Sequence, residues 1–72
     1  MPYPIDGTWN ERIGYVLKHH KSEMTTTEIV DVIHEHYQPD WEKKKLMTSV
    51  SATISAALET IYTKNENKVS LI

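Results

Sequence analysis

Five lysines in the second half of the sequence are the side chains best suited to a chemical task, the binding of phosphate groups. Three are consecutive, and two flank the turn-rich segment Asn65-Glu66-Asn67; they are Lys43, Lys44, Lys45, Lys64 and Lys68. Residues 1–42 carry three basic and eight acidic side chains, whereas residues 43–72 carry five basic and two acidic ones. Local potential guides a polyanion, so the formal net charge of −2 does not exclude nucleic acid as a partner. Ordinary solvated surface charge is the alternative interpretation.

The four histidines are the other candidates for chemistry, in this case metal binding. His34 and His36 are two residues apart and His19 and His20 are adjacent, so the members of each pair leave a helix in different directions. Metal ligands on one helix face need a spacing of three or four residues. The sequence also lacks cysteine and an HExxH motif. We therefore expect no metal site and no cofactor, and we expect His20 and His36 to be packing residues on apolar helix faces.

Signatures of catalysis are missing from the sequence. Its two glycines, Gly7 and Gly14, cannot build a loop that cradles phosphates, and no nucleophile elbow is present. Asp31 and Glu35 are four residues apart, a spacing that is also common on solvated helix faces. We expect a protein that is not an enzyme and has no small-molecule substrate.

The length of 72 residues predicts one domain over residues 1–72, with a small core. No secretory signal and no membrane-spanning apolar run is present. With the absence of cysteine, this favours a soluble intracellular protein, either cytoplasmic or in the nucleoid or nucleus. The chain stops inside an expected strand, which also fits a piece of a longer protein.

Two capping boxes predict where the first two helices begin. Residues 1–7 contain two prolines and a glycine and are expected to be an extended lead-in. Thr8 with Glu11, and Thr25 with Glu28, have the spacing at which a threonine hydroxyl and a glutamate each bond the other's backbone N–H. The predicted helices are 9–20 and 26–37.

A short strand is expected before the second helix, and a proline follows the helix. Pro39 follows the predicted end of the helix, because the residue before a proline avoids the helical region. The segment 22–24 is expected to be a short strand that pairs with the C-terminal hairpin, with Met24 facing inward. Trp9 is expected in the core, and Trp41 is expected to pack at its edge.

The last third of the sequence predicts a third helix and a hairpin. A short turn is expected over 41–45, a helix over 47–58 and a hairpin over 60–72, in which Ile61 faces inward and Tyr62 outward. Asn65 and Asn67 are expected to take any left-handed backbone at the turn. The predicted core consists of Ile13, Leu17, Ile29, Ile33, Val50, Ile54, Leu58, Ile61 and Leu71.

The sequence contains, in this order, the segments TWNERIGYVLKHH, MTTTEIVDVI, KKKLMTSVSATISAAL and IYTKNENKVSLI. Together they resemble winged helix-turn-helix domains, and in particular the HARE-HTH type found in restriction endonucleases and in the delta subunit of bacterial RNA polymerase. In that type the first helix often begins with Trp, as at Trp9. The second helix follows a (T)-x-x-E-I start, to which residues 26–29 correspond. A lysine-containing segment then precedes a T-V-S third helix, as at 45–51. The resemblance covers residues 8–72 and implies an α+β fold with three helices and a β-hairpin wing, and a role in DNA binding or transcription.

The third helix departs from the family pattern, which usually offers basic or amide side chains for reading bases. Its outward face offers Thr48, Ser49, Ala52 and Ser55. Small hydroxyl side chains can contact phosphates, which carry no sequence information. We therefore expect double-stranded DNA as partner, bound with weak sequence preference by these four residues and the five lysines. The alternative is a winged helix that binds protein within a larger assembly, through the same small-residue face or the open edge of the wing.

Overall fold

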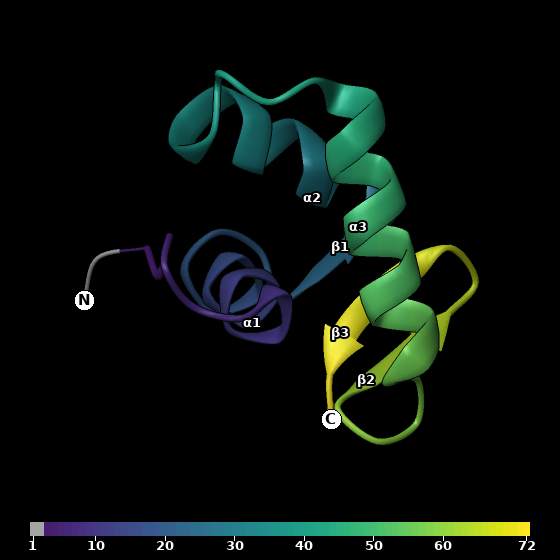
Figure 1. The fold of residues 1–72 in the computed structure, drawn as a ribbon. Helices are drawn as coiled ribbons and strands as arrows, with labels where there is room; N and C mark the ends of the chain where they lie inside the picture. The colour runs from purple at the N-terminus through teal and green to yellow at the C-terminus, as the bar shows by residue number, and fades with distance from the viewer. Residues whose placement is uncertain (1–2) are drawn as a thin grey trace.

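A computed structural model describes residues 3–72, in which helices pack against one three-stranded antiparallel sheet (Figure 1). This arrangement confirms the predicted α+β class. The elements in chain order are α1 (Trp9–His19), β1 (Glu23–Thr25), α2 (Thr26–Val32), the π-helix η1 (Ile33–Tyr37), α3 (Lys43–Ala56), β2 (Tyr62–Asn65) and β3 (Lys68–Leu71). Residues 1–2 of the predicted lead-in lie outside the described residues. The rest of it contains a turn, closed by a bond of 2.9 Å from the Gly7 N–H to the Pro4 carbonyl.

Both predicted capping boxes are confirmed. The Thr8 hydroxyl accepts from the Glu11 N–H at 3.2 Å, and the Glu11 carboxylate accepts from the Thr8 N–H at 3.4 Å. At the start of α2 the two equivalent distances, between Thr25 and Glu28, are both 3.1 Å. Each box satisfies two backbone donors that would otherwise have no partner in the first turn of the helix.

Replacing either capping threonine by alanine is expected to lower the free energy of unfolding by ~0.5–2 kcal/mol. Thr25→Ala should have the larger effect, because its box is partly buried whereas the box of Thr8 is exposed. Urea unfolding measures the change. Thr27→Ala is a matched control, since Thr27 is exposed in the same helical turn. A Thr25→Ala midpoint equal to that of the control would contradict the cap.

The sheet has the order β1-β3-β2, so the last strand lies in the middle. Met24 in β1 pairs with Val69 in β3, and both are buried. The predicted short strand and the inward position of Met24 are therefore confirmed. Tyr62 in β2 lies opposite Leu71 in β3.

The second helix ends at Tyr37 as predicted, but its last turn is wider than an α-helix. The Gln38 N–H bonds to the Ile33 carbonyl at 2.7 Å, five residues back, which is the π-helical pattern. Single π-helical turns are rare and are often found at functional sites. The buried side chain of Gln38 then accepts a bond of 2.6 Å from the Tyr3 hydroxyl, which fastens the lead-in to the end of η1.

The third helix is displaced relative to its prediction. It begins at Lys43 instead of residue 47 and ends at Ala56 instead of residue 58. The predicted turn over 41–45 is therefore wrong, and the three consecutive lysines form the first turn of the helix. Glu42 is the N-cap residue, without a side-chain bond to the helix among the described residues.

The core lies where α1, α2, η1 and α3 meet the inner face of the sheet. Its buried residues are Ile13, Val16, Leu17, Met24, Ile29, Val30, Ile33, Leu46, Val50, Ile54, Tyr62 and Val69. Two predicted members are wrong, since Leu58 and Ile61 are both 37% exposed, and Leu71 is only partly buried.

The facing of β2 explains the error at Ile61. A shift of one residue moves every side chain of a strand to the other face, so Tyr62 replaces Ile61 in the core. The Tyr62 hydroxyl donates to Asn10 Oδ1 of α1 at 2.8 Å, which allows a polar group to be buried there. At the turn, the positive φ of 60° belongs to Glu66, not to Asn65 or Asn67 as expected.

The two tryptophans contact each other edge to face, with ring centroids 5.8 Å apart. Trp9 is partly buried and packs against the core, whereas Trp41 is 43% exposed. Trp41 therefore covers Trp9 instead of packing directly on the core.

Candidate nucleic-acid interface

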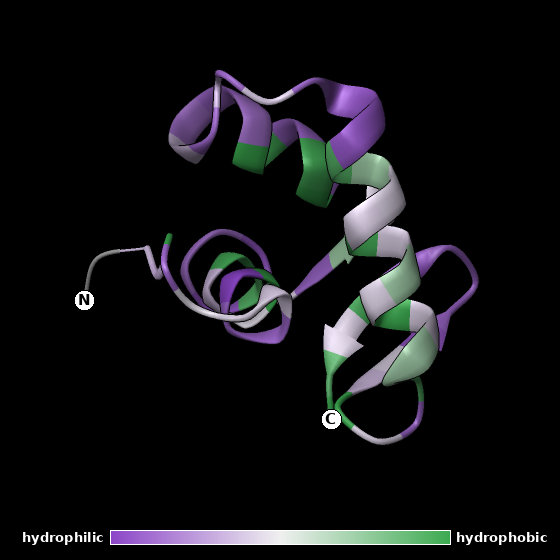
Figure 2. Ribbon diagram, viewed as in Figure 1, coloured by the Kyte–Doolittle hydropathy of each residue, from purple (hydrophilic) through white to green (hydrophobic). Residues whose placement is uncertain are grey.

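The five candidate lysines form two exposed groups, one at the start of α3 and one on the β2–β3 hairpin. Lys43, Lys44 and Lys45 make its first turn, and Lys64 and Lys68 lie on either side of the hairpin turn. Figure 2 shows hydrophilic residues at the start of α3 and at the tip of the hairpin, which projects beside the C-terminal half of the helix. Between the two groups the helix surface is less polar.

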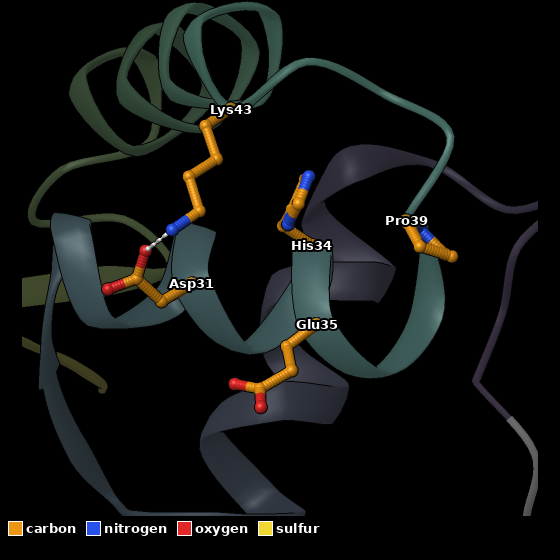
Figure 3. Close-up of a pocket in the computed structure, with 5 residues that line it drawn as sticks. All are labelled: Asp31, His34, Glu35, Pro39 and Lys43. Atoms are coloured by element: carbon orange, nitrogen blue, oxygen red, sulfur yellow. Dashed lines mark ion pairs between the residues drawn. The ribbon is translucent and has the colours of Figure 1, made fainter.

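Carboxylates of α2 oppose two of the five lysines. The Lys43 ammonium lies 3.1 Å from Asp31 Oδ1 in an ion pair between α3 and α2 (Figure 3). The pKa of Glu28 is lowered, mainly by the hydrogen bond from the Thr25 N–H and further by the charges of Lys21 and Lys68. Within residues 3–72, Lys44, Lys45, Lys64 and Lys68 form no ion pair.

The start of α3 has an unusually positive character for a helix N-terminus. Acidic side chains normally occupy the first turn, because the helix dipole is positive there. Here the first turn holds three lysines and no acidic residue. The N-cap residue before this turn is Glu42, whose side chain does not bond the backbone N–H groups of the turn, so these groups add to the positive potential of the lysines.

The outward face of α3 carries the four predicted small residues, of which Ser49 is partly buried and Thr48, Ala52 and Ser55 are exposed. The Thr48 hydroxyl donates to the Lys44 carbonyl at 3.0 Å, so its proton is already used within the helix. Its oxygen can accept but cannot also donate to a phosphate. The hydroxyl of Ser55 makes no hydrogen bond within the described part of the chain and keeps its proton available.

A hollow of about 400 Å³ lies between α2, η1 and the start of α3. Asp31, His34, Glu35, Pro39 and Lys43 line it, as Figure 3 shows. Its charges are mixed, and no group of three or more His, Cys, Asp or Glu side chains placed to hold a metal occurs among residues 3–72.

The sequence predicted His20 and His36 to be packing residues, and this prediction is wrong, because both are exposed and contact each other and Tyr37 in an aromatic cluster. His20 and His36 are both exposed, and their ring centroids lie 5.7 Å apart. His20 Nε2 is 2.8 Å from the Tyr37 hydroxyl. Sequence reasoning missed this contact because it compared only histidines within one helix, and these two come from different elements.

No helix among the described residues is long and apolar enough to cross a membrane. Comparisons with models of protein families, with curated proteins and with solved structures gave no match.

Proposed function

We propose that this chain is a winged helix-turn-helix module, of the HARE-HTH type, that binds the backbone of double-stranded DNA in a transcription-associated role. The order helix, strand, helix, helix, hairpin supports this proposal, as does the sheet order β1-β3-β2. In this reading α3 approaches the groove and the β2–β3 hairpin is the wing.

One observation carries the proposal: positive charge gathers at the two places from which a winged helix reaches phosphates. Lys44 and Lys45 stand at the uncapped start of α3, and Lys64 stands beside the turn of the wing. An α-helix rises ~1.5 Å per residue, so the 14 residues of α3 span ~21 Å between its ends. The first group lies at the N-terminal end of this helix and the tip of the hairpin lies beside its C-terminal half (Figure 2), so the two groups can engage phosphates at separate points of a duplex, while the small residues allow close approach between them.

Weak sequence preference follows from the side chains on α3. Arginine, asparagine and glutamine make the paired contacts that identify bases, and α3 contains none of them. Lysine contacts to phosphate fix position and orientation but do not distinguish sequences.

The salt dependence of binding to a mixed-sequence duplex tests the proposal. Each phosphate neutralised releases condensed counterions, so the four candidate lysines without an ion pair predict a slope of about −3.6 for log affinity against log salt. Lys44→Ala combined with Lys45→Ala should bring the slope to about −1.8 and weaken binding at low salt. Fluorescence anisotropy of a labelled duplex measures both.

Lys18→Ala is the matched control, because Lys18 is equally exposed but lies in the last turn of α1. Equal effects of the control and the double substitution would mean that only net charge matters. Absence of duplex binding by the parent at low salt would overturn the proposal.

A second function, protein binding by the same fold, is favoured by exposed apolar side chains near the base of the hairpin. Leu58 and Ile61 are partly exposed, and Ile72 is 71% exposed. The Ile72 N–H bonds to the Ile61 carbonyl at 3.0 Å, so these side chains belong to one region. If duplex binding fails, Ala52, Ser55 and this region are the surfaces to test.

A further inference from the structure

Two histidines that are 16 positions apart in the chain meet at one end of the molecule. His20 is the C-cap residue of α1, and His36 lies in η1. Their ring centroids are 5.7 Å apart and their planes are tilted by 34°. Both side chains are exposed, so water and ions have access to them.

This separation suits a shared metal ion. Imidazole nitrogens bind zinc at ~2.1 Å, which puts the ion ~3.2 Å from each ring centre. Two rings on one ion can therefore have centres up to ~6.4 Å apart, and a tetrahedral angle at the metal gives ~5.2 Å. The observed distance lies between these two values.

Tyr37 restrains the position of the His20 ring. Its hydroxyl lies 2.8 Å from His20 Nε2, and its own ring stacks on Tyr3 with centroids 4.2 Å apart and planes 6° from parallel. A histidine that binds metal through one nitrogen usually hydrogen-bonds through the other, which fixes the tautomer and the ring orientation. Tyr37 supplies this partner and leaves Nδ1 of His20 for an ion.

Nearby carboxylates do not complete the coordination. Glu28 and Asp31 border a hollow that His20 also lines. Each of them faces a lysine, since Glu28 lies 3.7 Å from Lys21 and Asp31 lies 3.1 Å from Lys43. Water would therefore fill the remaining positions around an ion held by the two rings.

We propose that His20 and His36 form a two-histidine site for a borderline divalent transition metal, such as Zn²⁺ or Ni²⁺, which bridges the end of α1 to η1. Imidazole suits these ions, whereas Mg²⁺ and Ca²⁺ prefer oxygen ligands. Because the two ligands come together only in the folded chain, the ion binds the folded state and raises its unfolding midpoint.

Isothermal titration calorimetry with Zn²⁺ and with Ni²⁺, at a pH where imidazole is neutral, tests the site. The parent should bind one equivalent of either ion, and His20→Ala and His36→Ala should each weaken binding by at least about tenfold. His19→Ala and His34→Ala are matched controls, because each lies within two residues of a proposed ligand. Both controls should keep the parent affinity, and Mg²⁺ should leave the unfolding midpoint unchanged.

A measurement on the parent alone covers the case in which a variant fails to fold. Substoichiometric Ni²⁺ should broaden the imidazole NMR signals of His20 and His36 before those of His19 and His34. Earlier broadening at His19 or His34 would overturn the proposal, as would equal loss of affinity in all four alanine variants or the absence of saturable binding.

Discussion

Truncation of Ile54 to alanine is expected to lower the free energy of unfolding by ~2–5 kcal/mol. Ile54 lies in the last turns of α3 with 4% of its surface exposed, and it belongs to the single core cluster. The loss combines the transfer free energy of the removed carbons with the cavity that remains. Domains of this size have a stability of only ~5–15 kcal/mol, so the change removes a large share of it. Urea unfolding followed by circular dichroism measures it.

Ile61→Ala is a matched control, because it removes the same atoms from an isoleucine that is 37% exposed. We expect it to cost about 1 kcal/mol, since less apolar surface returns to water and no closed cavity forms. The comparison also tests the hairpin register. If Ile61→Ala is as costly as Ile54→Ala, the inward position of Tyr62 is wrong.

Alkaline pH is expected to destabilise the fold through two tyrosines. Burial raises the pKa of Tyr62 to about 12, and burial also raises that of Tyr3 to about 12 although Arg12 opposes it. In the unfolded chain a tyrosine titrates near pH ~10. Between these values the unfolded state releases protons that the folded state keeps, so stability is full below pH ~10 and falls as pH rises toward ~12.

The contribution of Tyr62 to this loss should reach about 2 kcal/mol, because its side chain is fully buried. Tyr62→Phe should reduce the fall of the urea unfolding midpoint between pH ~10 and pH ~12. It should also lower stability near neutral pH, because the hydrogen bond to Asn10 is lost. The difference between parent and variant isolates Tyr62, because the two proteins share every other ionisable group. Parallel alkaline limbs would show that Tyr62 ionises normally in the folded state.

Local signals predicted the first half of the fold well. Each capping box is a three-residue spacing that acts within one helical turn, so the starts of α1 and α2 could be read from Thr8 and Thr25. The start of α3 carries no such signal, because Glu42 makes no side-chain cap and lysines follow it. The helix is instead held by burial of Leu46, Val50 and Ile54, which fixes its face but not its first residue.

The features that the sequence did not predict depend on contacts between segments that are far apart in the chain. Which of Ile61 and Tyr62 faces inward depends on Asn10, a hydrogen-bond partner 52 residues away in the chain. The pairing of His20 with His36 likewise depends on how α1 packs against η1. The hydrophobic periodicity of a single segment predicts neither the facing of β2 nor the contact between the two histidines. The candidate lysines could be named from the sequence, but the ion pair that occupies Lys43 could not.

The strand order has a consequence for how the protein folds during its synthesis on the ribosome. The central strand β3, which both other strands need as their partner, is the last element of the sheet to be synthesised. β1 emerges more than forty residues earlier and has no strand to pair with until Lys68–Leu71 leaves the exit tunnel. Until then Met24 of β1 and Tyr62 of β2 have no partner strand. We therefore expect the nascent chain to acquire its fold late and in one step, and to be most exposed to chaperones and proteases just before that step.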